Sequence, residues 1–124
     1  MGVNVLIVDD SVAIRMILAR ALRRTDLPLD QVFEAGDGCA AIEILKNQKV
    51  GVILSDINMP NMDGLQFLAE LKATGQSAGV PVVMISTEST QSKVMEAVRL
   101  GAKGFIKKPF EADEIRDKLS AFLT

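Results

Sequence analysis

Three acidic side chains in this sequence follow apolar runs that end abruptly. Asp9 and Asp10 come directly after residues 3–8, and Asp56 closes an apolar run at 50–54 that only Gly51 interrupts. The carboxyl ends of parallel strands open into the crevice where α/β sheets bind ligands. Three carboxylates brought together there repel unless a cation lies among them, and an all-oxygen ligand set suits Mg²⁺ or Mn²⁺. The sequence therefore predicts a divalent-metal site with Asp56 as the reacting group.

Two further polar side chains, Ser86 and Lys108, end the apolar stretches at 80–85 and 104–107. If the metal neutralises Asp56 while it attacks phosphorus, the Lys108 ammonium and the Ser86 hydroxyl can hold phosphoryl oxygens where charge develops. Such a site transfers a phosphoryl group onto a carboxylate.

Histidine is absent, and cysteine occurs once, as Cys39. From within this chain, these counts exclude His-based acid–base chemistry, Ser-His-Asp triads, zinc sites of His or Cys, and an internal disulfide. Cys39 lies in a small-residue helical stretch, for which a packing role is expected.

Composition favours one domain spanning residues 1–124, because 48% of the 124 residues are hydrophobic and no second domain is visible. The net charge is −2 and the Lys and Arg residues are scattered, which argues against nucleic-acid binding. The apolar runs are too short to cross a bilayer, and the first residues lack signal-peptide features. We expect a cytoplasmic protein.

Short apolar runs alternate with helical patterns, which is typical of βαβ units with a parallel sheet. Strands are predicted at 3–8, 31–35, 49–55, 80–85 and 104–107, and helices at 39–48, 64–74, 90–100 and 111–123. The polar residues in 31–35 suit an edge strand, and the nearly continuous apolar run in 49–55 implies helices on both faces. A further helix begins after a cap at Asp10 or Ser11, with a predicted inward stripe of Ile14, Ile17, Leu18, Ala21 and Leu22.

The motifs taken together resemble the receiver domains of two-component response regulators. They are Asp9-Asp10, Asp56 followed by Asn58-Met59-Pro60 and Asp63-Gly64, Ser86, and Lys108-Pro109. The resemblance covers the whole chain and is strongest to the single-domain chemotaxis regulators of the CheY type. It implies an α/β, flavodoxin-like (CheY-like) fold, with a five-stranded parallel sheet in order 2-1-3-4-5 and helices on both faces.

The resemblance also implies the chemistry. Asp56 would be phosphorylated from a phosphohistidine of a sensor histidine kinase. Mg²⁺, or Mn²⁺, would be bound by Asp10, Asp56 and the backbone carbonyl of Asn58, with Asp9 acting partly through water. The chain would catalyse only its own phosphorylation and dephosphorylation, and Asn58 and Glu88 would tune the loss of the phosphoryl group.

A switch mechanism is implied in the same way. Ser86 moves toward the phosphoryl group and Phe105 turns inward, although Phe105 lacks the hydroxyl of the tyrosine often found there. Partners, such as a flagellar motor switch component or a phosphatase, then recognise a surface that includes Gln91, Val94, Val98, Phe105 and Lys118.

Other interpretations stay open. Taken singly, Asp10 suits a helix cap, Lys108 a surface amine, and Phe105 or the arc of Val94 and Val98 core packing. The chain could be a receiver of a longer transcriptional or enzymatic regulator. A metal-dependent phosphohydrolase would want a second acid where Asn58 stands, and a flavodoxin-like binding module would find Asp9-Asp10 repelling its phosphate.

Overall fold

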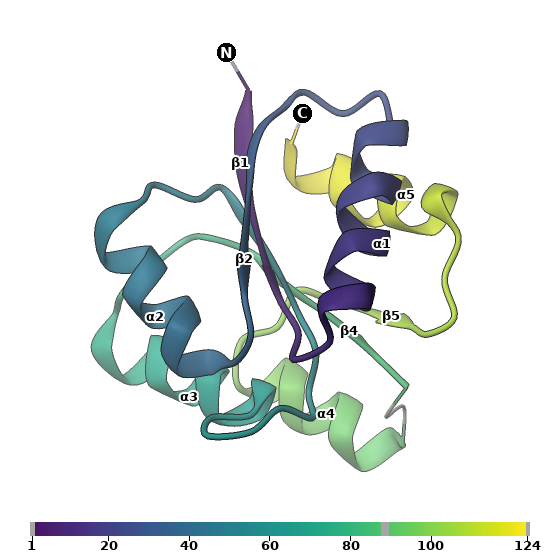
Figure 1. Cartoon of the computed structure of the whole chain (residues 1–124). Coiled ribbons are helices and arrows are strands. Elements are labelled where there is room, and N and C mark those ends of the chain that lie inside the picture. Colours follow the sequence, from purple (N-terminus) through teal and green to yellow (C-terminus); the bar gives the residue numbers. More distant parts are fainter. Residues whose placement is uncertain (1, 88–89, 124) are drawn as a thin grey trace.

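The computed structural model describes residues 2–87 and 90–123, and within them helices cover both faces of a central sheet (Figure 1). Along the chain the elements alternate in the order β1 (Val3–Val8), α1 (Val12–Arg24), β2 (Leu29–Ala35), α2 (Gly38–Asn47), β3 (Val52–Ser55), α3 (Gly64–Thr74), β4 (Val82–Ser86), α4 (Gln91–Arg99), β5 (Gly104–Lys107) and α5 (Ala112–Leu123). All strand pairs are parallel and the order is β2-β1-β3-β4-β5. The predicted fold class and strand order are confirmed.

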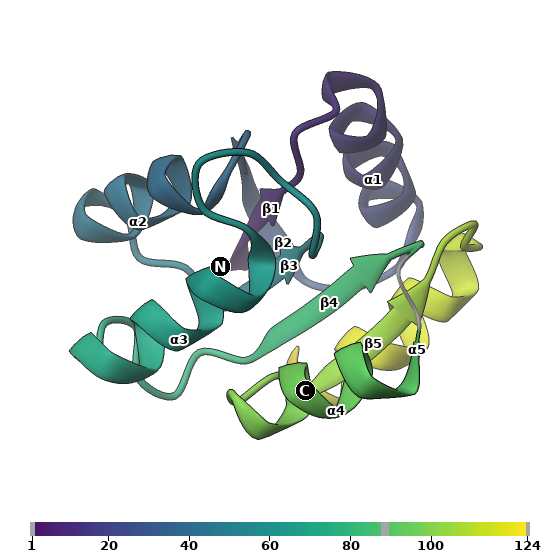
Figure 2. The same ribbon diagram turned by 90° about the horizontal axis from the view of Figure 1, so that it is seen from below.

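Alternate residues of the strands divide the core between the two faces of the sheet. Leu6 and Val8 of β1 belong to the cluster that contains Phe67 of α3 and Ala97 of α4, and Ala41 of α2 lies in the same cluster. Val5 and Ile7 instead belong to the cluster with buried residues of α1 and α5. One face is therefore covered by α2, α3 and α4, and the other by α1 and α5 (Figure 2).

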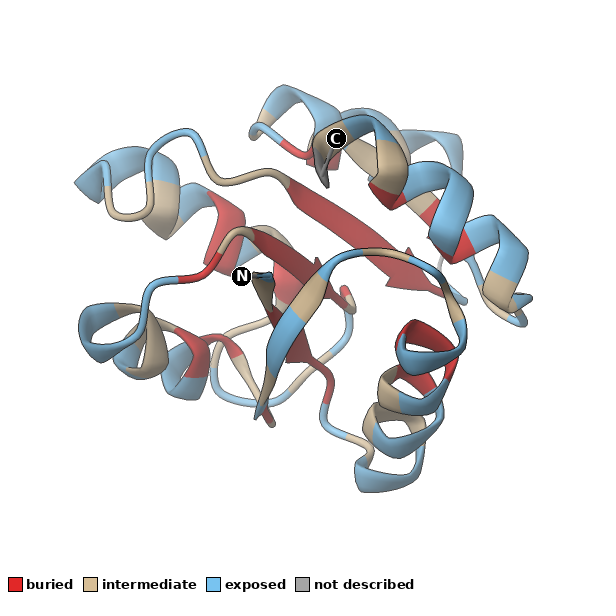
Figure 3. Cartoon of the chain, turned by 90° about the horizontal axis from the view of Figure 1, so that it is seen from above, coloured by how far each residue is buried: buried red, intermediate tan, exposed pale blue. Residues whose placement is uncertain are grey.

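The central strands β3 and β4 are buried along their whole length, whereas β2 is partly exposed (Figure 3). This confirms the predicted edge position of residues 31–35 and the double covering of the strand that leads to Asp56. The observed β2 begins two residues earlier than predicted, because Val3 pairs with Leu29. Pro81 directly precedes β4, where the missing N–H of proline costs no ladder bond.

Two side chains predicted to pack inward are exposed. Ile17 is 50% exposed, because the buried face of α1 consists of Leu18, Ala21 and Leu22, and Ile17 lies about 100° around the helix from Leu18. Cys39 is exposed because α2 buries Gly38 and Ala41 at its first turn, which leaves Cys39 on the outer side.

Polar side chains begin the helices that follow β1, β2 and β3. Ser11 caps α1, Asp37 caps α2, and Asp63 forms a capping box with Gln66 at the start of α3. These caps fix where each strand-end loop passes into its helix. No helix in the two described ranges combines the length and apolarity that a membrane span requires.

Candidate functional site

Asp9, Asp10 and Asp56 lie together at one edge of the sheet. Ligand oxygens from the three carboxylates lie within 4.8 Å of one another. The sheet register explains this, because Val8 pairs with Ser55 and the next residue of each strand emerges at the same level. The Asp56 N–H also donates to the Val8 carbonyl at 2.8 Å. The predicted acidic cluster therefore forms.

Asp9 is the buried member of the cluster, with 2% of its surface exposed. Its Oδ1 accepts from the Ser11 N–H at 2.9 Å, and its Oδ2 accepts from the Lys108 ammonium at 2.7 Å. Asp10 is exposed and Asp56 is intermediate. Solvent exposure therefore increases from Asp9 through Asp56 to Asp10.

Lys108 directly follows β5, the edge strand farthest from β2, and its side chain extends to the acidic cluster. Its ammonium lies 2.7 Å from Oδ2 of Asp9 and 3.3 Å from Oδ2 of Asp56. Its backbone N–H donates to the Ser86 carbonyl at 3.0 Å, which fixes the start of the loop after β5. One ammonium among three carboxylates leaves a formal charge of −2, and the donors are all oxygen, so the cluster could hold a divalent metal ion.

The backbone around Asp56 is tightly held. Its Oδ1 accepts from the Ile57 N–H at 2.7 Å, and the Gly64 N–H donates to the Ile57 carbonyl at 2.7 Å. A Cβ atom on Gly64 would lie 2.1 Å from the Asp56 carbonyl oxygen. The first turn of α3 therefore packs directly against the backbone of the candidate reacting residue.

The other predicted site residues are placed as follows. Ser86 ends β4, is fully buried, and belongs to the same sheet edge as the acidic cluster. Asn58 is exposed in the loop after Asp56. Glu88 lies outside the described residues.

Sequence reasoning did not single out Arg15 of α1 as a site residue. The Arg15 side chain is only 16% exposed, and its Nη1 donates to the Asp9 carbonyl at 2.6 Å while its Nε donates to Glu34 at 3.0 Å. No local pattern could have shown the contact with Glu34, because Glu34 lies on β2, 19 positions away in the sequence. Arg15 holds the backbone of the buried carboxylate from outside the cluster.

The predicted partner surface lies on α4, β5 and α5. Phe105 is partly buried and packs against the core cluster that includes Met84 and Ala97. Val94 is intermediate, whereas Val98 is 58% exposed, and Gln91 and Lys118 are exposed. Core packing, the open alternative for this arc, therefore does not account for Val98. Met95 is a further exposed apolar residue of α4 that sequence reasoning did not single out.

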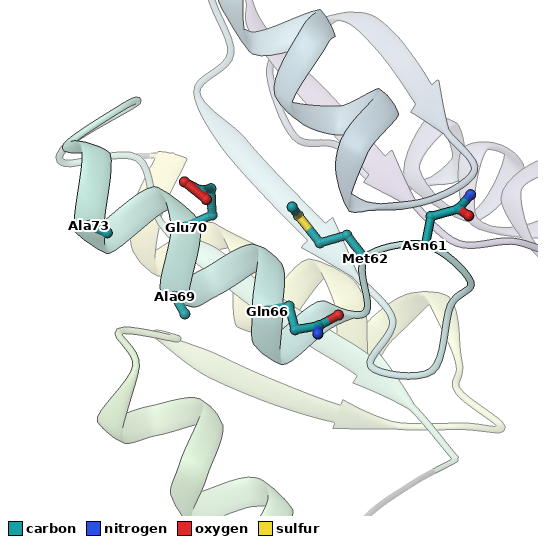
Figure 4. A pocket seen from close by; sticks show the side chains of 6 residues that line it. All are labelled: Asn61, Met62, Gln66, Ala69, Glu70 and Ala73. Carbon is teal, nitrogen blue, oxygen red and sulfur yellow. The ribbon is translucent and has the colours of Figure 1, made fainter.

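A hollow of about 410 Å³ lies beside α3, and no member of the acidic cluster lines it (Figure 4). Its lining residues are Asn61, Met62, Gln66, Ala69, Glu70 and Ala73. Glu70 is the one ionisable side chain among them, and neither a nucleophile nor a group of metal ligands converges there. Among the described residues, the carboxylates and the lysine that converge lie at the sheet edge instead.

This chain is similar to known proteins in both sequence and structure. The family described as response regulator receiver domain matches residues 5–120. The chain is 36% identical over 118 residues to the chemotaxis protein CheY-3 of Vibrio cholerae, covering 95% of this chain and 89% of that protein. It is 36% identical over 121 residues to a CheY homologue of Campylobacter jejuni, covering 97% and 92%. The solved structure of Vibrio cholerae CheY4 is 32% identical and superposes with a TM-score of 0.88 over 99% of this chain and 100% of that one.

Proposed function

Because this chain belongs to the family of response regulator receiver domains, we propose that Asp56 is the residue that accepts its phosphoryl group. A receiver of the CheY type is a phosphorylation-activated signalling switch. The observation that carries the assignment is the position of Asp56, at a strand end among three carboxylates and 3.3 Å from the Lys108 ammonium. No other described carboxylate combines a strand-end loop, partial exposure and such a cationic neighbour.

In the proposed step, a carboxylate oxygen of Asp56 forms a bond to phosphorus as the P–N bond of a phosphohistidine breaks. The electron pair of that bond stays on the imidazole nitrogen, which takes up a proton. The Lys108 ammonium, held between Asp9 and Asp56, is placed to attract an incoming phosphoryl oxygen. The Ser86 hydroxyl is assigned to a second phosphoryl oxygen.

Asp9, Asp10, Asp56 and the backbone carbonyl of Asn58 are the residues proposed to hold Mg²⁺, with Mn²⁺ as a substitute. When bound, the ion neutralises the carboxylates and the charge that develops on the phosphoryl oxygens. The oxygen donors and the formal charge of −2 support this choice over a softer metal.

The signalling output is proposed to pass through Ser86 and Phe105. Phe105 packs against the core cluster to which Ala97 of α4 belongs, so a shift of its ring is proposed to change the packing of the helix that carries Val94 and Val98. Gln91 and Lys118 complete the proposed partner surface. Asn58 and Glu88 are proposed to set how fast water removes the phosphoryl group.

The proposed donor is a sensor histidine kinase, and the proposed target is another protein. The named relatives are chemotaxis proteins, which supports a flagellar motor switch component as target and a phosphatase as a second partner. The proposed compartment is the cytoplasm, where ATP is available to the kinase.

Intact mass spectrometry after incubation with acetyl phosphate tests the assignment. The native chain should gain one phosphoryl group in the presence of Mg²⁺ and lose that gain in EDTA. Asp56→Asn should not be labelled, whereas Asp63→Asn should be, because Asp63 caps α3 and lies outside the acidic cluster. Labelling of Asp56→Asn at the native rate, or steady release of phosphate with no adduct on the native chain, would refute the proposal.

A further inference from the structure

We infer that a hydrogen bond between Asp37 and Asn61 positions the loop that carries the proposed Asn58 ligand, and that this bond raises the affinity of the site for Mg²⁺. The Asn61 Nδ2 donates to Asp37 Oδ2 at 2.7 Å. This bond, called here the loop bridge, joins the loop after β2 to the loop after β3. Figure 4 shows the Asn61 side chain directed away from α3. The inference rests on the proposed function.

A second contact joins the same two loops. The Gly38 N–H donates to the Met62 carbonyl at 3.0 Å. A Cβ atom on Gly38 would lie 2.7 Å from Met62 Cγ, so the Met62 side chain covers the start of α2. The loop bridge is exposed to solvent, but it lies beside this packed contact between the same two loops.

Asp37 accepts hydrogen bonds with both of its carboxylate oxygens. Its Oδ1 accepts from the Ala40 N–H at 2.8 Å as the cap of α2, which leaves Oδ2 for Asn61. The Ala40 N–H, and then the Asn61 amide, lower the pKa of Asp37 below its ordinary value. Asn61 has a φ of 65°, a left-handed conformation that asparagine tolerates better than most residues.

The loop from Ile57 to Gly64 is thus tied at both its base and its tip. At the base, the Gly64 N–H donates to the Ile57 carbonyl at 2.7 Å. At the tip, the loop bridge fixes Asn61, three positions after Asn58. Asn58 itself is exposed, so the direction of its carbonyl depends on these ties more than on burial. Groups that do not touch the metal but orient its ligands commonly influence the metal affinity.

Two variants remove the loop bridge while keeping the local backbone. Asp37→Ser retains a good helix cap but lacks the second carboxylate oxygen, Oδ2, to which Asn61 donates. Asn61→Gly retains the left-handed backbone and loses the amide. Asn47→Gly is the control, because it removes an exposed asparagine amide at the opposite end of α2, where it donates to Glu43.

The readouts are Mg²⁺ affinity by calorimetry and amide hydrogen exchange of residues 58–62 in metal-free buffer. Each bridge variant should bind Mg²⁺ about 3- to 10-fold more weakly, below the range of about 10- to 100-fold for direct partners of metal ligands. The double variant should be no weaker than the poorer single one, since both remove the same bond. Exchange of the loop amides should quicken in both variants and not in Asn47→Gly.

Native affinity in both bridge variants, or an equal loss in Asn47→Gly, would overturn the inference. Failure of the native chain to bind Mg²⁺ would instead refute the proposed metal site. In that case the exchange data would still report whether the loop bridge orders residues 58–62.

Discussion

The ammonium nitrogen of Lys108 lies 2.7 Å from Oδ2 of Asp9, although 99 positions separate the two residues in the sequence. Lys108 follows β5 at one edge of the sheet, and its side chain reaches past β4 and β3 to the end of β1. The two side chains are only 12% and 3% exposed. The contact therefore joins distant strands and balances part of the charge in the acidic cluster.

Replacing Lys108 should make the metal-free protein less stable and more dependent on divalent cations. In Lys108→Met, Asp9 and Asp56 lose the ammonium that lies between them. We expect a loss of about 2 kcal/mol in the free energy of unfolding, below the roughly 3–5 kcal/mol for a fully buried pair, because Asp10 and Asp56 reach solvent. Mg²⁺ should restore much of this loss and bind more tightly than to the native chain.

Urea unfolding followed by far-UV circular dichroism, with and without Mg²⁺, measures both effects, since the chain lacks Trp and Tyr. Lys107→Met is the control, because Lys107 is exposed one position earlier. Equal unfolding midpoints for Lys108→Met and Lys107→Met in metal-free buffer would contradict this explanation.

A methyl group on Gly64 should disturb the acidic loop directly. In Gly64→Ala the new Cβ would lie 2.1 Å from the Asp56 carbonyl oxygen and 2.8 Å from Ile57 Cα, both backbone atoms that cannot rotate away. We expect about 2 kcal/mol of destabilisation from this overpacking, with slower labelling by acetyl phosphate. The control Gly36→Ala meets its nearest atom at 3.7 Å. Native stability in Gly64→Ala would show that α3 can shift freely against Asp56.

The contribution of Asp37 to stability should depend on pH. Hydrogen bonds from Ala40 and Asn61 lower the pKa of Asp37 below its ordinary 3.8 in the folded state. The charged carboxylate therefore stabilises the fold above pH 3.8, and this contribution disappears as the pH falls through the lower pKa of the folded state. Asp37→Asn cannot titrate, so the stability difference between native chain and variant should shrink on acidification.

Urea unfolding of both proteins at pH 6 and at pH 3 measures that difference, and the titration of every other group cancels in the comparison. Asp30→Asn, an exposed acid on β2, serves as the control. A difference that stays constant between the two pH values would mean that the hydrogen bonds to Asp37 do not favour its charged form.

Removing the Ser86 hydroxyl should separate phosphorylation from its structural consequence. Ser86→Ala deletes one oxygen at a fully buried strand end. We expect its labelling by acetyl phosphate to fall by less than about tenfold, which is less than the loss on removing an oxyanion donor. Hydrogen exchange at Phe105 and along α4 should change on labelling in the native chain, and not in Ser86→Ala.

Ser92→Ala, an exposed serine on α4, is the matched control for this comparison. The same exchange response in Ser86→Ala and in the native chain would remove Ser86 from the switch. If hydrogen exchange at Phe105 did not change when the native protein is labelled, Phe105 would not be part of the switch either.

Much of the architecture could be predicted from the chain alone. Apolar runs of strand length that end at Asp9, Asp56, Ser86 and Lys108 are a local signal, because a doubly covered strand must be apolar along its whole length. β1 and β5 were predicted to the residue, and α3 was as well. The strand order followed from the family resemblance rather than from the pattern.

The errors came from residues at the edge of a buried face. Ile17 satisfied the helical spacing of α1, yet the buried stripe of that helix is narrower than the pattern suggests. The predicted packing role of Cys39 was wrong for a similar reason, at the first turn of α2. Helical periodicity indicates a direction of burial, but the neighbouring helices decide how wide the buried stripe is.

The sequence by itself determined the order of the strands and helices along the chain and which polar side chains stand at the strand ends, because local apolar periodicity indicates which segments are buried. It did not determine every boundary, since β2 begins two residues earlier and β3 three residues later than predicted. Only the tertiary structure decided the pairing of those side chains. Lys108 with Asp9, Arg15 with Glu34, and Asn61 with Asp37 each join segments that are far apart in the sequence. Such contacts depend on strand register and on how loops pack across the sheet edge, and neither is encoded at the residues that make them.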